Sequence, residues 1–140
     1  MTAETTSGKI VGTVVCLPVR DLTAASDFYR AVFDLPELEI GEGMVVVEIP
    51  GLSLFLIEEQ AFETYSEKAG RGVAYPGKDT SVILSCAVES RVALDDMLST
   101  AASLGGTVPR RAGMDEELGL YLGYFFDPDG HHWELAHSDK

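Results

Sequence analysis

The chain has 140 residues, 46% of them hydrophobic, and its 23 acidic and 10 basic side chains give a formal net charge of −13. A chain of this size fits one compact domain, and so acidic a chain lacks the basic patches that bind nucleic acid. It shows no apolar run near the roughly 20 residues that span a membrane and no signal peptide at its start, so we predict a cytoplasmic protein without nucleic-acid or membrane partners.

The first predicted element is a strand over residues 12–19, which are rich in valine. Strand side chains alternate between two faces, so Val14 and Cys16 share a face. Asp21 is placed to cap a helix that ends near Pro36. The apolar residues of this helix fall on one stripe: Leu22, Ala25, Phe28, Val32 and Phe33. The pattern is that of a strand leading into an amphipathic helix.

Two strands and a short helix are predicted to complete the first half of the chain. The strands cover residues 44–49 and 52–57 and are joined by a Pro-Gly turn. The short helix runs from about residue 60 to residue 69 and ends at Gly70. Residues 71–79 contain two glycines and a proline, which predicts a linker.

The sequence pattern then repeats. Residues 14–28 resemble residues 83–97, and each residue lies 69 positions before its counterpart. Ile83 therefore corresponds to Val14, and Ser85 to Cys16. Such a duplication predicts two similar structural units that share a core.

The second unit is predicted to continue as the first did. A helix that ends at Gly105-Gly106 is followed by strands near residues 107–111, over 120–126 and over 131–137. The stretch between the last two strands, Asp127-Pro128-Asp129-Gly130, has the composition of a type I turn. A strand, a helix and then two or three strands are thus expected in each half, and a ferredoxin-like sandwich is the alternative with similar elements.

All three histidines lie at the final strand, together with Glu134. Alternation puts His132 and Glu134 on one face and His131 and His137 on the other, which argues against a metal cluster. We expect His131 to pack near the turn and His137 to be solvated.

Two segments carry a family resemblance: Leu17-Pro18-Val19-Arg20-Asp21-Leu22 with Phe28-Tyr29 behind it, and Phe126-Asp127-Pro128-Asp129-Gly130-His131-His132-Trp133-Glu134. They resemble the vicinal oxygen chelate superfamily of glyoxalases, bleomycin-resistance proteins and extradiol dioxygenases, in particular its lactoylglutathione lyase-like branch. The resemblance implies an α+β fold in which two βαβββ modules form an incomplete barrel around a cleft, usually completed in a homodimer. Module one would cover about 12–70 and module two about 80–137, within a single domain 12–140 that follows a tail, 1–11.

The resemblance also implies where a metal would bind, because metal-dependent members place ligands on the first and last strands of each module. These positions fall on Val14, Phe55 (or Ser53), Ile83 and Glu134. Only Glu134 can bind a metal strongly, so we expect no metal and no other cofactor. The residues expected to line the cleft are Glu134, His132, Val14, Cys16, Phe55, Ile83 and Ser85.

The favoured hypothesis is a metal-independent protein that sequesters a small molecule in an apolar cleft with one carboxylate. The acidic surface would suit a cationic ligand. The alternative is a glyoxalase-like lyase or isomerase with Glu134 as general base, and a dimeric interaction protein is a third possibility. Residues 110–117 form either a loop over the cleft or a plain surface loop. Of Tyr121 and Tyr124, which differ in strand parity, only one can face the cleft.

Overall fold

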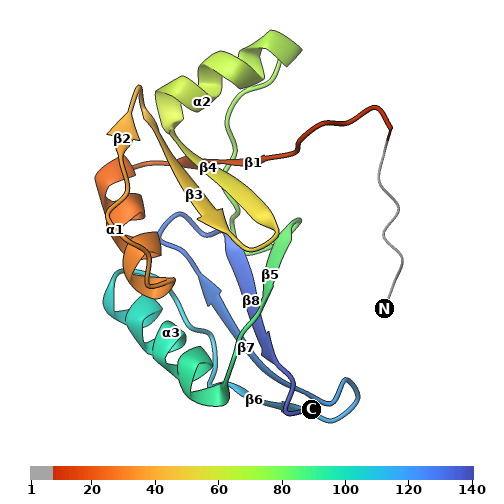
Figure 1. The fold of residues 1–140 in the computed structure, drawn as a ribbon. Coiled ribbons are helices and arrows are strands. Elements are labelled where there is room, and N and C mark those ends of the chain that lie inside the picture. Colours follow the sequence, from red (N-terminus) through yellow and green to blue (C-terminus); the bar gives the residue numbers. More distant parts are fainter. Residues whose placement is uncertain (1–7) are drawn as a thin grey trace.

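The computed structural model describes residues 8–140, and this part of the chain forms two four-stranded sheets and three α-helices (Figure 1). The first sheet has the strand order β1-β4-β3-β2 and the second the order β5-β8-β7-β6. The first module contains β1 (Val15–Val19), α1 (Leu22–Val32), β2 (Ile40–Gly41), β3 (Met44–Ile49) and β4 (Leu52–Glu58). The second contains β5 (Ile83–Ala87), α3 (Arg91–Ser103), β6 (Gly113–Asp115), β7 (Leu120–Phe126) and β8 (His132–His137). Three strands follow each long helix, which confirms the two βαβββ modules and excludes the ferredoxin-like alternative.

A third helix, α2 (Glu59–Ser66), continues as a 3-10 turn to Ala69 and ends at Gly70, whose φ of 74° is left-handed. Residues 71–79 then cross from the first module to the second without helix or strand. Tyr75 holds this connection in place, because its ring lies 3.7 Å from the Arg20 guanidinium and its hydroxyl donates to Glu59 at 2.9 Å. The predicted N-terminal tail, residues 1–11, falls mostly on residues 1–7, which lie outside the described residues.

The duplication is visible in the helix caps. The Asp21 side chain accepts a hydrogen bond of 3.0 Å from the backbone N–H of Ala24, and Ser90 does the same for Ala93 at 3.0 Å. Each cap satisfies a backbone donor that the first helical turn leaves free. The caps lie 69 residues apart, the offset expected from the repeat.

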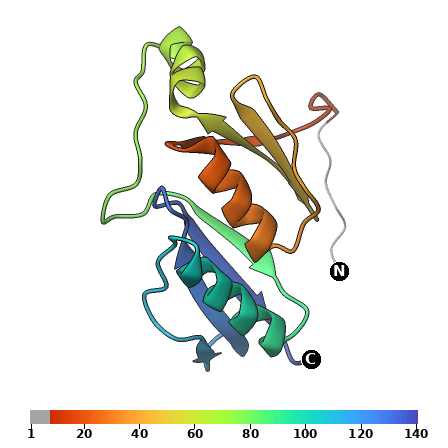
Figure 2. The same ribbon diagram turned by 90° about the vertical axis from the view of Figure 1, so that its left-hand side faces the viewer.

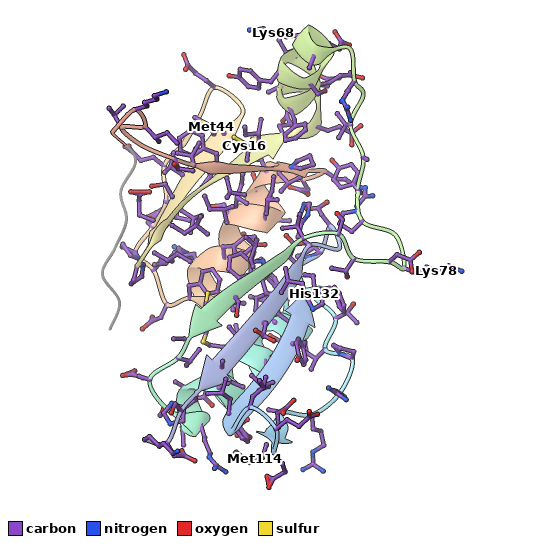
Figure 3. All side chains as sticks on the ribbon, turned by 90° about the vertical axis from the view of Figure 1, so that its right-hand side faces the viewer. Cys16, Met44, Lys68, Lys78, Met114 and His132 are labelled. Atoms are coloured by element: carbon purple, nitrogen blue, oxygen red, sulfur yellow. The ribbon has the colours of Figure 1, made fainter. Side chains whose placement is uncertain are left out.

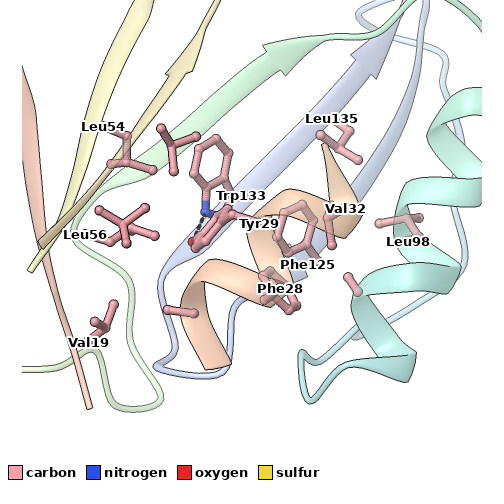
Figure 4. Packing of buried hydrophobic residues seen from close by; sticks show 14 of the residues in the cluster. Val19, Phe28, Tyr29, Val32, Leu54, Leu56, Leu98, Phe125, Trp133 and Leu135 are labelled. Atoms are coloured by element: carbon pink, nitrogen blue, oxygen red, sulfur yellow. Dashed lines mark hydrogen bonds between the residues drawn. The ribbon is translucent and has the colours of Figure 1, made fainter. Parts of the chain in front are cut away.

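One hydrophobic core lies beneath both long helices, which cover the same side of the molecule in front of the two sheets (Figure 2). Trp133, Phe125, Phe28 and Tyr29 are its largest aromatic members (Figure 4), and the rings of Phe125 and Trp133 stack with centroids 6.0 Å apart. The opposite face of each sheet, the open face, carries no long helix. No helix in residues 8–140 is long and apolar enough to cross a membrane.

The turn between β7 and β8 joins the two modules. Asp127 accepts hydrogen bonds from the backbone N–H groups of Asp129 and His131 at 2.9 and 2.8 Å, which confirms its role as a turn residue. Its other carboxylate oxygen accepts from the Tyr29 hydroxyl at 2.5 Å, and that hydroxyl accepts from Trp133 Nε1 at 2.9 Å. A buried polar network therefore links α1 of the first module to the turn and last strand of the second.

Two further contacts cross the same junction. Asp129 accepts from the backbone N–H of Arg20 at 3.0 Å and also pairs with its guanidinium at 3.3 Å. The His131 ring is buried, with Nε2 2.9 Å from the carbonyl oxygen of Pro18. His131 thus packs near the turn, as predicted.

Two local expectations are wrong. The strand expected near residues 107–111 is only an isolated bridge from Thr107 to Phe126, and the strand at this edge lies at Gly113–Asp115. Pro109 explains the difference, because it has no N–H to donate to a ladder. His137 is not solvated: its Nδ1 lies 2.8 Å from the carbonyl oxygen of Val88 and its Nε2 3.2 Å from Asp139.

Candidate functional site

Glu134 lies at the centre of the open face of the second sheet. Its neighbours on β8, Trp133 and Leu135, are fully buried in the core, so strand alternation directs Glu134 to the opposite face. Ser85 on β5 is its register partner on one side and Tyr124 on β7 on the other. The Ser85 hydroxyl donates to Glu134 Oε1 at 2.6 Å. The carboxylate is half-buried and forms no salt bridge with any residue of 8–140.

Tyr124 is the tyrosine that shares this face. Burial raises the pKa of its phenol, and the negative charge of Glu134 and the hydrogen bond that the phenol donates to Glu134 raise it further, while Arg110 lowers it. The phenol therefore stays protonated at neutral pH and can donate a hydrogen bond. Tyr121 has the opposite parity, and its hydroxyl donates to Asp95 on α3 at 2.8 Å.

Arg110 extends this row of polar residues beyond β7. Its guanidinium carbon lies 5.7 Å from the centroid of the Tyr124 ring, within the range of a cation–π contact. We call Ser85, Glu134, Tyr124 and Arg110 the polar strip. The strip runs across the sheet in the order β5, β8, β7 and then the segment before β6.

The segment from residue 110 to residue 117 borders the open face of the second sheet. Together with Leu122 and Tyr124, which lie on that face, its residues line a pocket of about 460 Å³. Leu122 is buried although it points away from the long helices. The segment therefore borders this pocket, and part of it, Gly113–Asp115, is the strand β6 and not a loop; whether it covers a cleft stays a prediction.

His132 lies beside Glu134 on the open face, where it is the register partner of Ile83. Its Nδ1 is 3.0 Å from the Thr80 hydroxyl, and its ring packs on Phe126 with centroids 4.8 Å apart. Its Nε2 is buried and has no hydrogen-bond partner among the described residues. One nitrogen of this ring thus contacts the residue that directly follows the connection between the modules.

The first sheet carries the other predicted site residues. Cys16 and Phe55 are register partners on its open face, and together with α2 they form a pocket of about 430 Å³. The lining is mostly apolar and comprises Cys16, Met44, Phe55, Ile57, Phe62, Tyr65 and Ser66. Val14 lies just before β1 and is 44% exposed. Figure 3 looks onto the side opposite the long helices and shows Cys16 and His132 on different sheets, so the predicted residues form two groups.

The sequence matches one known protein family. The model of the Glyoxalase/Bleomycin resistance protein/Dioxygenase superfamily matches residues 10–135. The chain belongs to this superfamily. A search of the curated proteins gave no match.

Solved structures of the glyoxalase superfamily share the fold. A hypothetical protein, SA1046, from S. aureus is 25% identical, with a TM-score of 0.76 over 93% of this chain and 95% of that chain. A glyoxalase-related enzyme from Fulvimarina pelagi is 26% identical, with a TM-score of 0.76 over 91% and 88% of the two chains. A lactoylglutathione lyase from Agrobacterium tumefaciens, at 21% identity, a TM-score of 0.63 and coverage of 91% and 92%, shows the same fold.

The side chains predicted from the family resemblance to stand at the metal positions do not form a set that fits a metal ion. Val14, Phe55 and Ile83 offer hydrocarbon where N or O donors are needed. The carboxylate of Glu134 is bonded to Ser85. Within residues 8–140 there is no group of three or more His, Cys, Asp or Glu side chains that could hold a metal ion.

The two cysteines lie on opposite faces of equivalent strands. Cys16 is exposed on the open face, and Cys86 packs partly against the core. Burial raises the pKa of both thiols. Neither thiol is therefore activated as a nucleophile near neutral pH.

Arg110 was not identified as a site residue from the sequence, and Tyr124 was left undecided against Tyr121. The register of the β7–β8 hairpin decides the tyrosine, because the turn places Tyr124 directly opposite Glu134. If the register of this hairpin could be fixed from its turn sequence, the choice between the two tyrosines could be made without the structure. Arg110 has no such signal, since the loop that carries it follows no strand pattern.

Proposed function

We propose that this chain binds a small molecule on the open face of its second sheet, with Glu134 as the anchor and without a metal. The observation that carries the proposal is a half-buried carboxylate whose partners, Ser85 and Tyr124, are neutral and which forms no salt bridge within residues 8–140. A carboxylate in this setting gains most from a ligand that brings a cationic group or a hydrogen-bond donor. The apolar side chains at the superfamily's other ligand positions support binding over metal-assisted chemistry.

We further propose that the protein acts in the cytoplasm as a homodimer in which a second copy completes the cleft. Large apolar side chains remain exposed on the strand side, among them Ile83 at 53% and Val82 at 59%. Such exposure is typical of a surface that another molecule covers. The open faces of the two sheets would then line the cleft from different directions.

Isothermal titration with a panel of cationic glycopeptide and aromatic antibiotics tests the binding proposal. We expect a stoichiometric heat that a chelator leaves unchanged and that Glu134→Gln weakens at least tenfold. Glu63→Gln is the matched control, because Glu63 is an exposed acid on α2 outside the polar strip. Equal affinity of both variants and the native protein would refute the assignment of Glu134.

Tyr124 favours a second candidate, a lyase or isomerase of the glyoxalase type. Its protonated phenol could donate to a substrate oxygen while Glu134 removes a proton next to the carbonyl. Turnover of the hemithioacetal of methylglyoxal in the presence of chelator, lost in Tyr124→Phe and Glu134→Gln, would support this function. Absence of turnover together with ligand binding would leave the binding function alone.

A further inference from the structure

We propose that Arg110 is a second anchor of the same site, so that the ligand carries an anionic group as well as the group that meets Glu134. The inference rests on the proposed function and specifies its ligand class. It assigns Arg110 as the residue that selects ligands with a carboxylate or a similar anion.

The guanidinium of Arg110 has no charged partner among the described residues. Within residues 8–140 it makes no hydrogen bond and no ion pair, and it lies against the face of the Tyr124 ring. Arg20 and Arg91, by contrast, pair with Asp129 and Asp139. Arg30, Arg71 and Arg111 likewise form no ion pair within residues 8–140, so it is the contact with the Tyr124 ring, together with its place on the pocket wall, that distinguishes Arg110.

The surroundings of Arg110 suit a ligand. Arg110 and Arg111 both line the pocket of about 460 Å³, and Tyr124 forms part of its wall. Three carboxylates, those of Asp115, Glu116 and Glu117, line the same pocket, and none forms an ion pair with either arginine. Asp115 accepts instead from the backbone N–H of Leu118 at 3.0 Å. The negative charge of Asp115 also acts on Tyr124, so an anion at this wall would need direct contact with the Arg110 guanidinium, which can hold a carboxylate through two parallel hydrogen bonds.

The polar strip also limits the shape of the ligand. The Tyr124 side chain stands between the carboxylate of Glu134 and the guanidinium of Arg110, so the two opposite charges flank one aromatic ring. A molecule that reaches both needs a donor at one end, an anion at the other and a short apolar chain to lie on the ring. An ω-amino carboxylic acid is the simplest compound with this design.

Titration by NMR with a series of linear ω-amino acids, from 3-aminopropanoate to 6-aminohexanoate, tests the inference. Each amino acid is compared with the alkylamine of the same chain length, which lacks the carboxylate. We expect at least one amino acid to bind fivefold or more tightly than its amine. Arg110→Gln should remove that difference and leave the affinity for the amine unchanged, and Arg71→Gln, an exposed arginine of the inter-module connection, should have no effect.

The outcomes separate this inference from the proposed function. If amines and amino acids bind equally and Glu134→Gln weakens both, Arg110 is not an anchor and the Glu134 site stands. If Arg110→Gln and Arg71→Gln weaken binding of the amino acids equally, the effect is one of net charge and the assignment of Arg110 fails. If no compound of either series binds, the inference about Arg110 is refuted, while the antibiotic titration still decides the Glu134 site. If compounds bind and Glu134→Gln changes nothing, both proposals are refuted.

Discussion

Replacing Tyr29 with phenylalanine should lower the free energy of unfolding by about 3 kcal/mol, because it removes one oxygen from the buried junction between the modules. Tyr29 and Trp133 are fully buried and Asp127 is nearly so. The lost hydroxyl donates to Asp127 and accepts from Trp133. The variant therefore loses a hydrogen bond to a carboxyl group and leaves a buried indole N–H without a partner, and each loss costs on the order of 1–3 kcal/mol.

Urea unfolding followed by tryptophan fluorescence measures this loss, because Trp133 is the sole tryptophan and lies at the junction. For a chain of this length the thermal midpoint should fall by about 10 °C. Tyr65→Phe is the matched control, since Tyr65 is 59% exposed and its hydroxyl makes no hydrogen bond within residues 8–140. A loss below about 1 kcal/mol for Tyr29→Phe, or an equal loss in the control, would refute the reasoning.

Three further predictions concern other parts of the molecule. Burial, above all, raises the pKa of Asp127, so the folded state binds its proton more tightly than the unfolded state. The stability that the native protein has over Asp127→Asn in urea unfolding should therefore shrink as pH rises from 4 to 7. A difference that grows with pH would contradict the assignment. Gly123→Ala should cost about 2 kcal/mol, because the new Cβ would lie 2.7 Å from Leu98 and 2.8 Å from Leu94, whereas Gly77→Ala has open space and should be neutral in the same assay. Chelator should leave the thermal midpoint unchanged, and a stoichiometric divalent ion in elemental analysis would show that the metal positions have been misassigned.

Much of the fold could be predicted because local signals and the repeat agree. Asp21 and Ser90 each precede an apolar stripe, and capping needs only a short polar side chain at that point. The second strand of the second module, β6, was misplaced for the opposite reason. Its three residues, Gly113–Asp115, have no apolar alternation, and their place at the sheet edge depends on pairing with β7.

The candidate site was predictable only in part. Strand parity was enough to place His132 and Glu134 together, because alternation is a local property. The contact between Ser85 and Glu134 joins residues 49 positions apart and depends on the parallel register of β5 and β8. The division of the predicted cleft residues between two sheets also depends on tertiary packing, which no local pattern encodes.

The turn between β7 and β8 has a consequence for how such sequences are interpreted. Its most recognisable residues, Asp127, Asp129 and His131, all bind partners that hold the two halves of the chain together. The motif that carries the family resemblance is therefore constrained by the packing of the two modules, whereas the positions for metal ligands are constrained by the chemistry of a bound metal. Because the two constraints act on different residues, the turn sequence identifies the fold without indicating which side chains stand at the metal positions.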